Sequence, residues 1–330
     1  MKRVFSGIKP TGELHLGNYL GAIKNWIDLQ DTYECVFSIV DLHAMTVPYE
    51  PEMLRKNVFK MACNYLACGL DPEKSILMIQ SQCQKHAELT WLLNCLTPVS
   101  WLERVPTFKE KAQQYAENVN MGLMDYPVLM TADIILYKAE FVPVGEDQLP
   151  HLELAREILR RFNARFGDIF PEPKDIIGKG ARVKGLDGSA KMGKSLDNCI
   201  YLYETPEDIW KKLAKAVTDP ARIRKTDPGD PQKCNIYSFH QLFSDTETQN
   251  KIADGCRTAG IGCMDCKKCL AKNMADELEP IRSKYTDFME KPDLVYDILN
   301  DGNKKANIIA EKTMTEVYEK TGISYPEFKN

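Results

Sequence analysis

The stretch Arg3–Gly21, RVFSGIKPTGELHLGNYLG, decides the fold of the first part of the chain. Its apolar run, residues 4–8, is typical of a buried strand, and KPTG at residues 9–12 interrupts it. From Leu16 to Leu29 apolar residues recur at helical spacing. HLGN at residues 15–18 is therefore predicted to stand where a strand end turns into a helix start. In a parallel α/β sheet this is where ligands bind, and the helix start offers free N–H groups to an anion.

Two common nucleotide-binding fingerprints are absent from this stretch. A dinucleotide site needs G-x-G-x-x-G, whereas the glycines here fall at positions 7, 12, 17 and 21. A P-loop needs a lysine after its second glycine, and Asn18 takes that place after Gly17. Taken alone, HLGN could equally be an ordinary turn with one exposed histidine. The sequence therefore predicts a nucleotide-binding site at a strand–helix junction that has neither fingerprint.

A second motif, GSAKMGKS, occupies residues 188–195. Lys191 and Lys194 stand three residues apart on a loop of small residues. Two ammonium groups on such a loop suit a pyrophosphate leaving group, whose charge grows in the transition state. By itself the motif could also be a solvated surface loop.

HLGN and KMGKS together resemble the paired signatures of class I aminoacyl-tRNA synthetases. Five longer segments make the resemblance more specific: FSGIKPTGELHLGNYLGA, FSIVDLHAMT, LERVPTFKEK, YPVLMTADIILY and VPVGEDQLPH. The chain resembles the bacterial-type tryptophanyl-tRNA synthetases over nearly its whole length. It departs from them at Lys9, where many members have Gln, and at Gly193, which replaces the serine of KMSKS.

The pattern of elements predicts two domains. Strands and helices alternate up to about residue 200, and only helical patterns follow, beginning with the helix start TPED at 205–208. We expect a Rossmann-like α/β domain with a parallel sheet over residues 1–200, which binds nucleotide. A helical domain over 201–330 would follow, of the anticodon-binding type that the resemblance implies, with its last helices returning to the first domain. The last long helix is expected over about 303–320.

Composition limits the class of protein. Hydrophobic residues make up 44% of the 330, and the net charge is −4, so any RNA would meet a local basic patch. No run of 18 apolar residues occurs and no signal sequence precedes the first strand, so we expect a soluble cytoplasmic protein without membrane contact. Reduced core cysteines are expected at Cys35, Cys63, Cys68, Cys83, Cys95 and Cys199.

The helix predicted over 121–138 bears on specificity. Tyr126, Met130, Asp133 and Tyr137 share one of its faces. A buried carboxylate needs a partner, and the indole N–H of tryptophan is a donor only. An arginine or a backbone amide could satisfy Asp133 equally well. The resemblance matches Asp133 to the family's tryptophan-sensing aspartate, and it implies a tryptophan site formed by Asp133, Gln148, Tyr126, Met130, Phe5, His43, Val142 and Val144.

The resemblance also implies the ATP site and the catalytic groups. The ionised tryptophan carboxylate would attack the α-phosphate without a general base, with Mg²⁺ beside the leaving pyrophosphate. The catalytic residues implied are His15, Asn18, Lys111, Lys191 and Lys194. The ATP-binding residues implied are Lys9, Pro10, Thr11, Gly17, Asn18, Gly145, Glu146, Asp147, Val183, Lys191, Met192, Gly193, Lys194 and Ser195.

Five cysteines, at 234, 256, 263, 266 and 269, form a C-x21-C-x6-C-x2-C-x2-C pattern. Such spacing in a cytosolic chain suggests metal thiolate ligation, by zinc or by an iron–sulfur cluster. A minority of bacterial tryptophanyl-tRNA synthetases carry C-x22-C-x6-C-x2-C around a [4Fe–4S] cluster. That resemblance implies Cys234, Cys256, Cys263 and Cys266 as ligands, zinc being the alternative, and leaves Cys269 as an extra thiol.

We therefore expect an enzyme that activates L-tryptophan with ATP and transfers it to tRNA(Trp), as a homodimer. Three alternatives stay open at this stage. One is a tyrosyl-specific synthetase of the same subclass. Another is a synthetase-like protein that binds tRNA or tryptophan without catalysis. The third is an iron–sulfur redox protein with a nucleotide fold.

Overall fold

The computed structural model describes residues 1–325 apart from 106–107, 110–112, 114, 178–182, 189–191 and 194–195. The chain divides into two compact units. Unit 1 contains residues 1–13, 25–178 and 291–330, and unit 2 contains residues 14–24 and 179–290. The boundary expected near residue 200 stays a prediction.

The described part of unit 1 contains a five-stranded sheet in the order β3-β2-β1-β4-β5. All neighbouring strands pair in parallel, which confirms the predicted sheet. From β1 the chain proceeds to β2 and β3 on one side, then returns to β4 on the other, so the strand order reverses between β1 and β4. In open parallel sheets ligands bind beyond the strand ends at this reversal. The strands are β1 (Arg3–Ile8), β2 (Glu34–Ile39), β3 (Ser75–Ile79), β4 (Phe141–Val144) and β5 (Lys174–Ile177).

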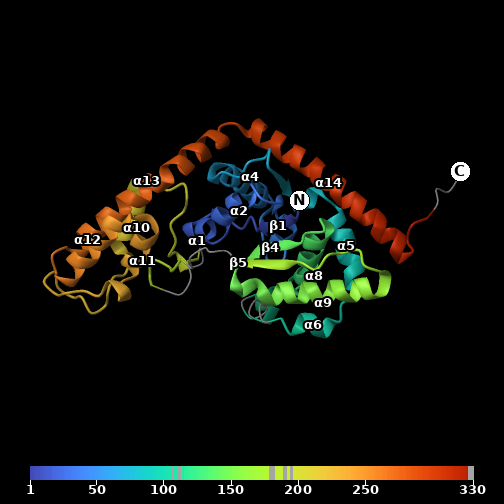
Figure 1. The fold of residues 1–330 in the computed structure, drawn as a ribbon, viewed down its shortest axis with the longest axis horizontal. Coiled ribbons are helices and arrows are strands. Elements are labelled where there is room, and N and C mark those ends of the chain that lie inside the picture. The colour runs from blue at the N-terminus through green and yellow to red at the C-terminus, as the bar shows by residue number, and fades with distance from the viewer. Residues whose placement is uncertain are drawn as a thin grey trace. The chain divides into compact units, whose positions relative to one another are not determined.

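Helices cover both faces of this sheet (Figure 1). Among the described residues of unit 1, the helices that precede residue 291 are α2 (Lys24–Leu29), α3 (Asp41–Ala44), α4 (Pro51–Cys68), α5 (Lys85–Asn94), α6 (Val99–Glu103), α8 (Met121–Leu136) and α9 (Leu149–Phe166). The helix α1 (Leu16–Asn18) and a π-helical turn (Tyr19–Ile23) belong to unit 2. Short 3₁₀ turns lie at Gln80–Gln82, Ala116–Asn118 and Glu146–Gln148.

Alternation along the strands divides the core between the two faces. Val36 of β2 lies in one core cluster with residues of α5, α8 and α9. Its neighbour Phe37 points the other way and stacks on Trp26 of α2, with ring centroids 4.7 Å apart. Trp26 also meets Tyr65 of α4 edge-on. The sheet is thus buried on both sides, as its continuous apolar strands require.

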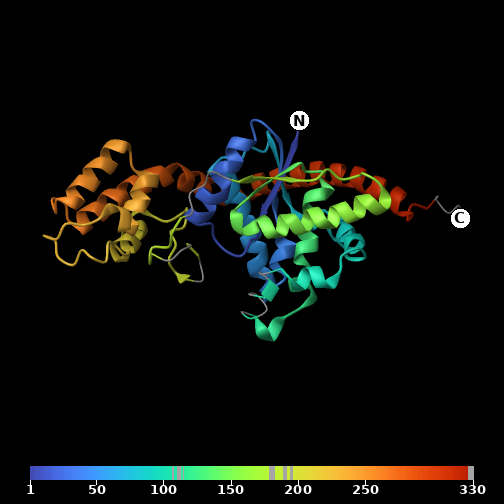
Figure 2. The same cartoon turned by 60° about the horizontal axis from the view of Figure 1, so that its bottom comes forward.

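The last helix, α14 (Pro292–Thr321), begins eleven residues before the expected start at 303. Asp301-Gly302-Asn303 has the composition of a turn, yet these residues lie inside the helix. The red ribbon of α14 in Figures 1 and 2 belongs to unit 1, where it packs on β3 and α5. Asn303 Oδ1 accepts a 2.9 Å hydrogen bond from the backbone N–H of Ile79 on edge strand β3. Tertiary packing therefore outweighs the local turn composition.

Gly302 allows this close approach. A Cβ built on Gly302 would lie 1.8 Å from the carbonyl oxygen of Leu77 in β3. Both atoms belong to backbone, so neither can turn away as a flexible side chain would.

We expect Gly302→Ala to lower the free energy of unfolding by about 1–3 kcal/mol, or more, because α14 must shift off β3. Thermal unfolding followed by circular dichroism measures the loss. Gly21→Ala is the matched control, since a Cβ on this helical glycine meets nothing within 4 Å. A melting temperature for Gly302→Ala equal to that of the control would contradict the packing described.

Unit 2 contains the helical region predicted after residue 201, drawn in orange in Figure 1. Thr205 caps its first helix and accepts a hydrogen bond from the N–H of Asp208, as TPED predicted. Its elements are α10 (Pro206–Lys215), a 3₁₀ turn (Pro231–Lys233), α11 (Asn235–Phe243), α12 (Thr246–Arg257) and α13 (Cys263–Met289). No helix in the described residues has both the length and the apolar character needed to cross a bilayer.

Candidate active site and cysteine cluster

HLGN forms the start of α1, as predicted, with two of its side chains acting as caps. His15 Nδ1 accepts a hydrogen bond from the N–H of Gly17 at 3.1 Å. The N–H of His15 in turn donates to Asn18 Oδ1 at 3.2 Å. A Cβ on Gly17 would lie 2.9 Å from His15 Cε1, so a glycine at this position lets the imidazole fold over the helix start. His15 and Asn18 hold each other in place.

The two signatures, distant in sequence, meet within unit 2. The N–H of Leu16 donates to the carbonyl of Ile200, and the N–H of Leu202 donates to the carbonyl of Leu14. Met192 of KMGKS is buried, and its Cβ would lie 3.6 Å from a Cβ placed on Gly17. The backbone N–H of Met192 donates to the carbonyl of Val183 at 3.1 Å. Residues predicted from both motifs are therefore neighbours.

Gly193 replaces the serine of the usual signature without a steric reason. Its N–H donates to Asn198 Oδ1 at 2.8 Å, and a Cβ would meet nothing within 4 Å. Four other predicted catalytic or ATP-binding residues lie outside the described residues: Lys111, Lys191, Lys194 and Ser195.

The other predicted ATP residues belong to unit 1 and follow the two strands that flank the reversal in strand order. Lys9, Pro10 and Thr11 come directly after β1, and residues 145–147 come directly after β4. The ammonium of Lys9 lies 5.3 Å from the ring centroid of Tyr126. The side chain of Glu146 is not among those described. Parallel topology thus brings two of the predicted segments to the end of the sheet where ligands bind.

Asp133 on α8, the predicted tryptophan-sensing residue, lies within a network of side-chain hydrogen bonds. It is 2% exposed, and its carboxylate accepts three side-chain hydrogen bonds. Gln80 Nε2 and His86 Nδ1 both donate to Oδ1, each at 2.7 Å. His43 Nε2 donates to Oδ2 at 2.8 Å. The partners are therefore neither an arginine nor a backbone amide, the two alternatives that the sequence had left open.

These partners keep Asp133 ionised. Burial alone would raise the pKa of Asp133, but the hydrogen bonds from His43 and His86 outweigh it and hold that pKa well below its usual range. The structure places His43 in the interior at 5% exposure.

A second layer of side chains fixes the donors. His86 Nε2 lies 2.8 Å from the hydroxyl oxygen of Tyr137, and this hydroxyl donates to Met78 Sδ at 3.2 Å. Phe5 of β1 stacks on Tyr137 with ring centroids 5.5 Å apart. Burial raises the pKa of the Tyr137 hydroxyl well above its usual value, so this hydroxyl stays protonated. Asp133 is thereby held in one orientation.

The remaining predicted tryptophan residues lie around α8 and β4. Tyr126 is buried, and its hydroxyl and His151 Nε2 are 3.1 Å apart. Met130 and Val144 are half-buried, and Val142 is buried. Gln148 Nε2 donates to Asp147 Oδ2 at 3.2 Å.

The sequence analysis missed Gln80 and His86 as partners of Asp133, and His151 as the partner of Tyr126. One signal was present, since the chain has only five histidines. All five lie among the described residues and are at most 7% exposed. Buried histidines need hydrogen-bonding partners, which points to polar networks inside the protein.

The cysteine cluster lies in unit 2, where Cys234, Cys256, Cys263 and Cys266 line one cavity. Cys269, the extra thiol of the pattern, is not among the residues that line it. No three Cys, His, Asp or Glu side chains in the described residues converge tightly enough to hold a single metal ion.

Basic groups surround these thiols. Arg222 Nη1 lies 3.7 Å from Cys256 Sγ. His240 Nε2 lies 3.4 Å from Cys266 Sγ, and burial lowers the pKa of this imidazole. Lys267, next to Cys266, is 6% exposed and donates to the carbonyls of Ala214 and Ala216.

The scattered cysteines behave as predicted, with one exception. Burial raises the pKa of Cys35, Cys63 and Cys68 to about 12, so these thiols stay protonated. Cys83 and Cys199 are also buried. Cys95 is exposed, which corrects its placement in the core. It follows the last turn of α5, where the chain reaches the surface.

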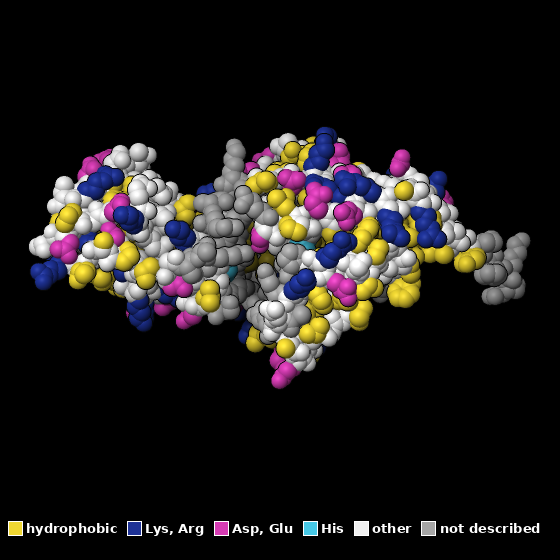
Figure 3. Space-filling view, turned by 90° about the horizontal axis from the view of Figure 1, so that it is seen from below, with side chains coloured by type: hydrophobic (Ala, Val, Ile, Leu, Met, Phe, Trp, Pro, Cys, Tyr) yellow, Lys and Arg dark blue, Asp and Glu magenta, His cyan; other side chains and the backbone are white. Residues whose placement is uncertain are grey.

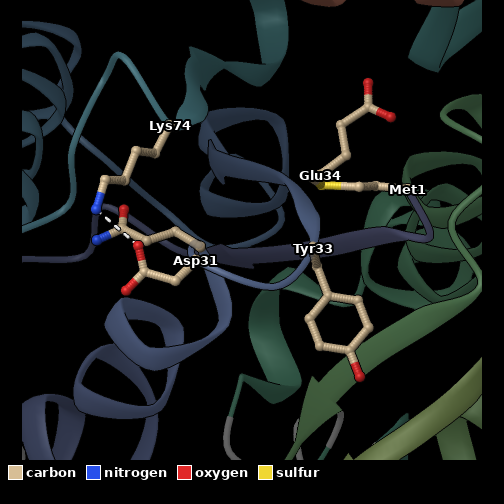
Figure 4. A pocket seen from close by; sticks show the side chains of 6 residues that line it. Met1, Asp31, Tyr33, Glu34 and Lys74 are labelled. Carbon is tan, nitrogen blue, oxygen red and sulfur yellow. Dashed lines mark hydrogen bonds and ion pairs between the residues drawn. The ribbon is translucent and has the colours of Figure 1, made fainter.

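A further hollow lies away from all predicted site residues (Figure 4). Its walls include Met1, Tyr33 and Glu34, together with an ion pair of 2.6 Å between Lys74 and Asp31. It adjoins the amino-terminal ends of β1 and β2, the end of a parallel sheet at which ligands do not usually bind.

Surface charge is mixed on the face seen in Figure 3. Lys and Arg side chains alternate there with Asp and Glu, and the described residues on that face form no continuous basic patch. The local basic patch expected for RNA stays a prediction.

Comparison with known proteins agrees with the geometry. The family model of class I tRNA synthetases (W and Y) matches residues 1–279. The tryptophan–tRNA ligase of Deinococcus radiodurans is 49% identical, with 98% of this chain and 99% of the relative covered. That of Thermotoga maritima is 44% identical, over 96% and 97%. The crystal structure of the Campylobacter jejuni tryptophanyl-tRNA synthetase with ADP and tryptophan has a TM-score of 0.89 and 37% identity, covering 97% and 99%.

A parallel sheet with flanking helices, a helical region and the joined signatures HLGN and KMGKS define a class I aminoacyl-tRNA synthetase fold. Two tryptophan–tRNA ligases are 49% and 44% identical to this chain over almost its whole length, which identifies one family within that class. The chain belongs to the tryptophanyl-tRNA synthetase family.

Proposed function

We propose that this protein is a tryptophan–tRNA ligase that activates L-tryptophan with ATP and transfers it to tRNA(Trp). The tryptophan carboxylate would attack the α-phosphate in line, pyrophosphate would leave, and the terminal ribose hydroxyl of the tRNA would then attack the aminoacyl carbonyl. The family membership and the arrangement of Asp133 support this proposal together.

Asp133 carries the choice of tryptophan. A carboxylate offers about four lone-pair positions, and Gln80, His86 and His43 occupy three of them. One position remains on Oδ2, and an indole N–H is a donor that could fill it. Because the other three donors fix the carboxylate, the acceptor is oriented before the amino acid arrives. Phenylalanine has no such donor, and the site would discriminate against it strongly.

The rest of the mechanism is positioning and charge stabilisation. His15 and Asn18 fix the start of α1, whose N–H groups would face phosphate. Lys191 and Lys194, with Lys111, would stabilise the charge that develops on pyrophosphate. Mg²⁺, when bound with ATP, would neutralise part of the phosphate charge. Lys9 to Thr11 and Gly145 to Asp147 would hold the nucleotide at the ends of β1 and β4.

Amino-acid-dependent exchange between ATP and pyrophosphate tests the function directly. We expect exchange with tryptophan and only background with tyrosine or without amino acid. Exchange with tyrosine instead would indicate a tyrosyl-specific enzyme and overturn the role of Asp133. No exchange with either, from folded protein, would favour the non-catalytic binder or the redox protein.

We further propose that Cys234, Cys256, Cys263 and Cys266 hold a [4Fe–4S] cluster, the alternative being zinc. Three observations fit such a group. The four thiols line one cavity, as a four-thiolate ligand set requires. Cys263 and Cys266 lie in the first turns of α13, where the helix dipole favours thiolates. Arg222 Nε is buried without a hydrogen-bond partner among the described residues, and a sulfide or thiolate acceptor would satisfy it.

The experiment measures iron, acid-labile sulfide and zinc in protein purified without oxygen. These contents distinguish a [4Fe–4S] cluster from zinc. Four irons and four sulfides per chain support the cluster, whereas one zinc without sulfide replaces it with the alternative. Protein free of both metals would remove the metal centre from the proposal.

The homodimer expected from the resemblance and the cytoplasmic location expected from the sequence composition belong to the same proposal. Light scattering during gel filtration tests the first, with a mass of twice 37.6 kDa expected. A mass of one chain would contradict it.

A further inference from the structure

Two positively charged side chains are buried beside the four cysteines. Lys267 is 6% exposed and Arg222 is 9% exposed. Taking a charge out of water is costly unless an opposite charge compensates it. The compensation for these two cations therefore needs an explanation.

No carboxylate pairs with Lys267 in the part of the chain that the structure describes. Its ammonium donates to two backbone carbonyls at the end of α10, those of Ala214 at 2.8 Å and Ala216 at 2.7 Å. These carbonyls satisfy donors, but they carry only partial charge. Cys263 lies four residues before Lys267 on α13 and therefore on the same face of that helix, and Cys266 directly precedes Lys267.

Arg222 is held in a similar way. Nη2 donates to the carbonyls of Ile261 and Lys225, at 2.7 and 3.1 Å. Nη1 faces Cys256 Sγ, and Nε has no partner. The carboxylate of Asp219 accepts the N–H groups of Ala221 and Asp230 and adds one negative charge near Arg222, but it forms no ion pair with the guanidinium among the described residues.

We propose that Arg222 and Lys267 are the counter-charges of the group held by Cys234, Cys256, Cys263 and Cys266, and that they favour its more negative state. This inference rests on the metal centre proposed above. Four thiolates around either a [4Fe–4S]²⁺ cluster or Zn²⁺ carry a net charge of −2, which the two cations balance. Reducing the cluster by one electron would make that charge −3, and both cations would stabilise the added electron.

The test is a redox titration of the anaerobically purified cluster protein, with dithionite as reductant, followed by electron paramagnetic resonance. Arg222→Gln and Lys267→Gln remove the charge but keep an N–H donor for the carbonyls. We expect each to shift the reduction equilibrium on the order of tenfold toward the oxidised cluster, since a buried unit positive charge beside the ligand set is lost. For one electron, tenfold is a potential lower by about 59 mV.

Lys268→Gln is the matched control, because Lys268 is the next residue of α13 but is exposed over the ring of Trp210. Its potential should equal that of the wild type. Arg222→Lys and Lys267→Arg preserve charge, and they should stay close to the wild-type potential even if a Gln variant fails to fold.

The outcomes separate the two proposals. A cluster whose potential is the same in wild type, both Gln variants and the control would overturn the counter-charges while leaving the cluster intact. If the wild type holds zinc, the experiment measures instead the chelator concentration that removes half of the zinc. We expect this concentration to be about tenfold lower in the Gln variants. Equal concentrations in wild type and variants would overturn the counter-charge proposal. Wild-type protein without metal would overturn both proposals.

Discussion

Asp133→Ala should raise the KM for tryptophan by about 10- to 100-fold, because a hydrogen bond to a charged acceptor contributes about 1.5–3 kcal/mol. The KM for ATP should change little, since the predicted nucleotide residues follow β1 and β4 and do not include Asp133. Exchange kinetics with each substrate varied in turn measure both constants. An equal rise in the two would remove Asp133 from tryptophan recognition.

In Asp133→Ala, a loss of protein stability must be separated from the loss of tryptophan binding. Removing the carboxylate leaves the donors of His43, His86 and Gln80 without their acceptor, and such groups are costly when buried. Thermal unfolding therefore accompanies the kinetics. Asp125→Ala is the control on the same helix, because Asp125 forms a hydrogen bond of 2.9 Å with Asn94 and no contact with the histidines. It should leave both KM values unchanged.

Lys194→Ala should lower kcat for tryptophan activation on the order of 100-fold, the typical loss when one stabilising donor is removed from a transition state. The KM for tryptophan should change little, because the ammonium is proposed to act on pyrophosphate charge that develops during the reaction. Steady-state exchange kinetics measure both.

Lys211→Ala provides the comparison for Lys194→Ala. Lys211 is an exposed lysine of α10 that pairs with Glu207 on the helix surface, so its loss should not alter kcat. A wild-type kcat in Lys194→Ala would exclude the lysine loop from the mechanism.

Local patterns predicted most of the fold correctly because they depend on neighbours in sequence. The helix predicted over 121–138 forms as α8, Met121–Leu136. The apolar run of residues 4–8 forms most of β1, Arg3–Ile8. β5, at Lys174–Ile177, was missed, since its run is short and mixes charged with apolar residues.

The site was predicted less completely. The apolar helix face drew attention to Asp133 as a lone carboxylate, and the family resemblance assigned it to tryptophan. Its donors come from three other parts of the chain: His43 follows β2, Gln80 follows β3, and His86 begins α5. No spacing along the sequence connects these residues, because the parallel sheet and the packing of α5 on α8 bring them together.

For the cysteines too, the sequence predicted one part of the site and the structure added another. Their spacing indicated a cluster of five, and the resemblance selected four of them; those four line one cavity, whereas Cys269 does not. The role proposed for Arg222 could not be predicted from spacing, since it rests on a side chain 34 positions away from Cys256.

The parallel α/β class, the helix start at HLGN, the two signatures and the family could be predicted before folding was considered, because each is recorded in short contiguous segments. The start of α14 before Gly302, the histidine and glutamine partners of Asp133 and the two cations buried beside the thiols became visible in the folded chain. These features depend on backbone approach, on burial and on charge between distant segments. Such quantities exist only once the chain has folded, because burial and close contact determine what each polar group costs.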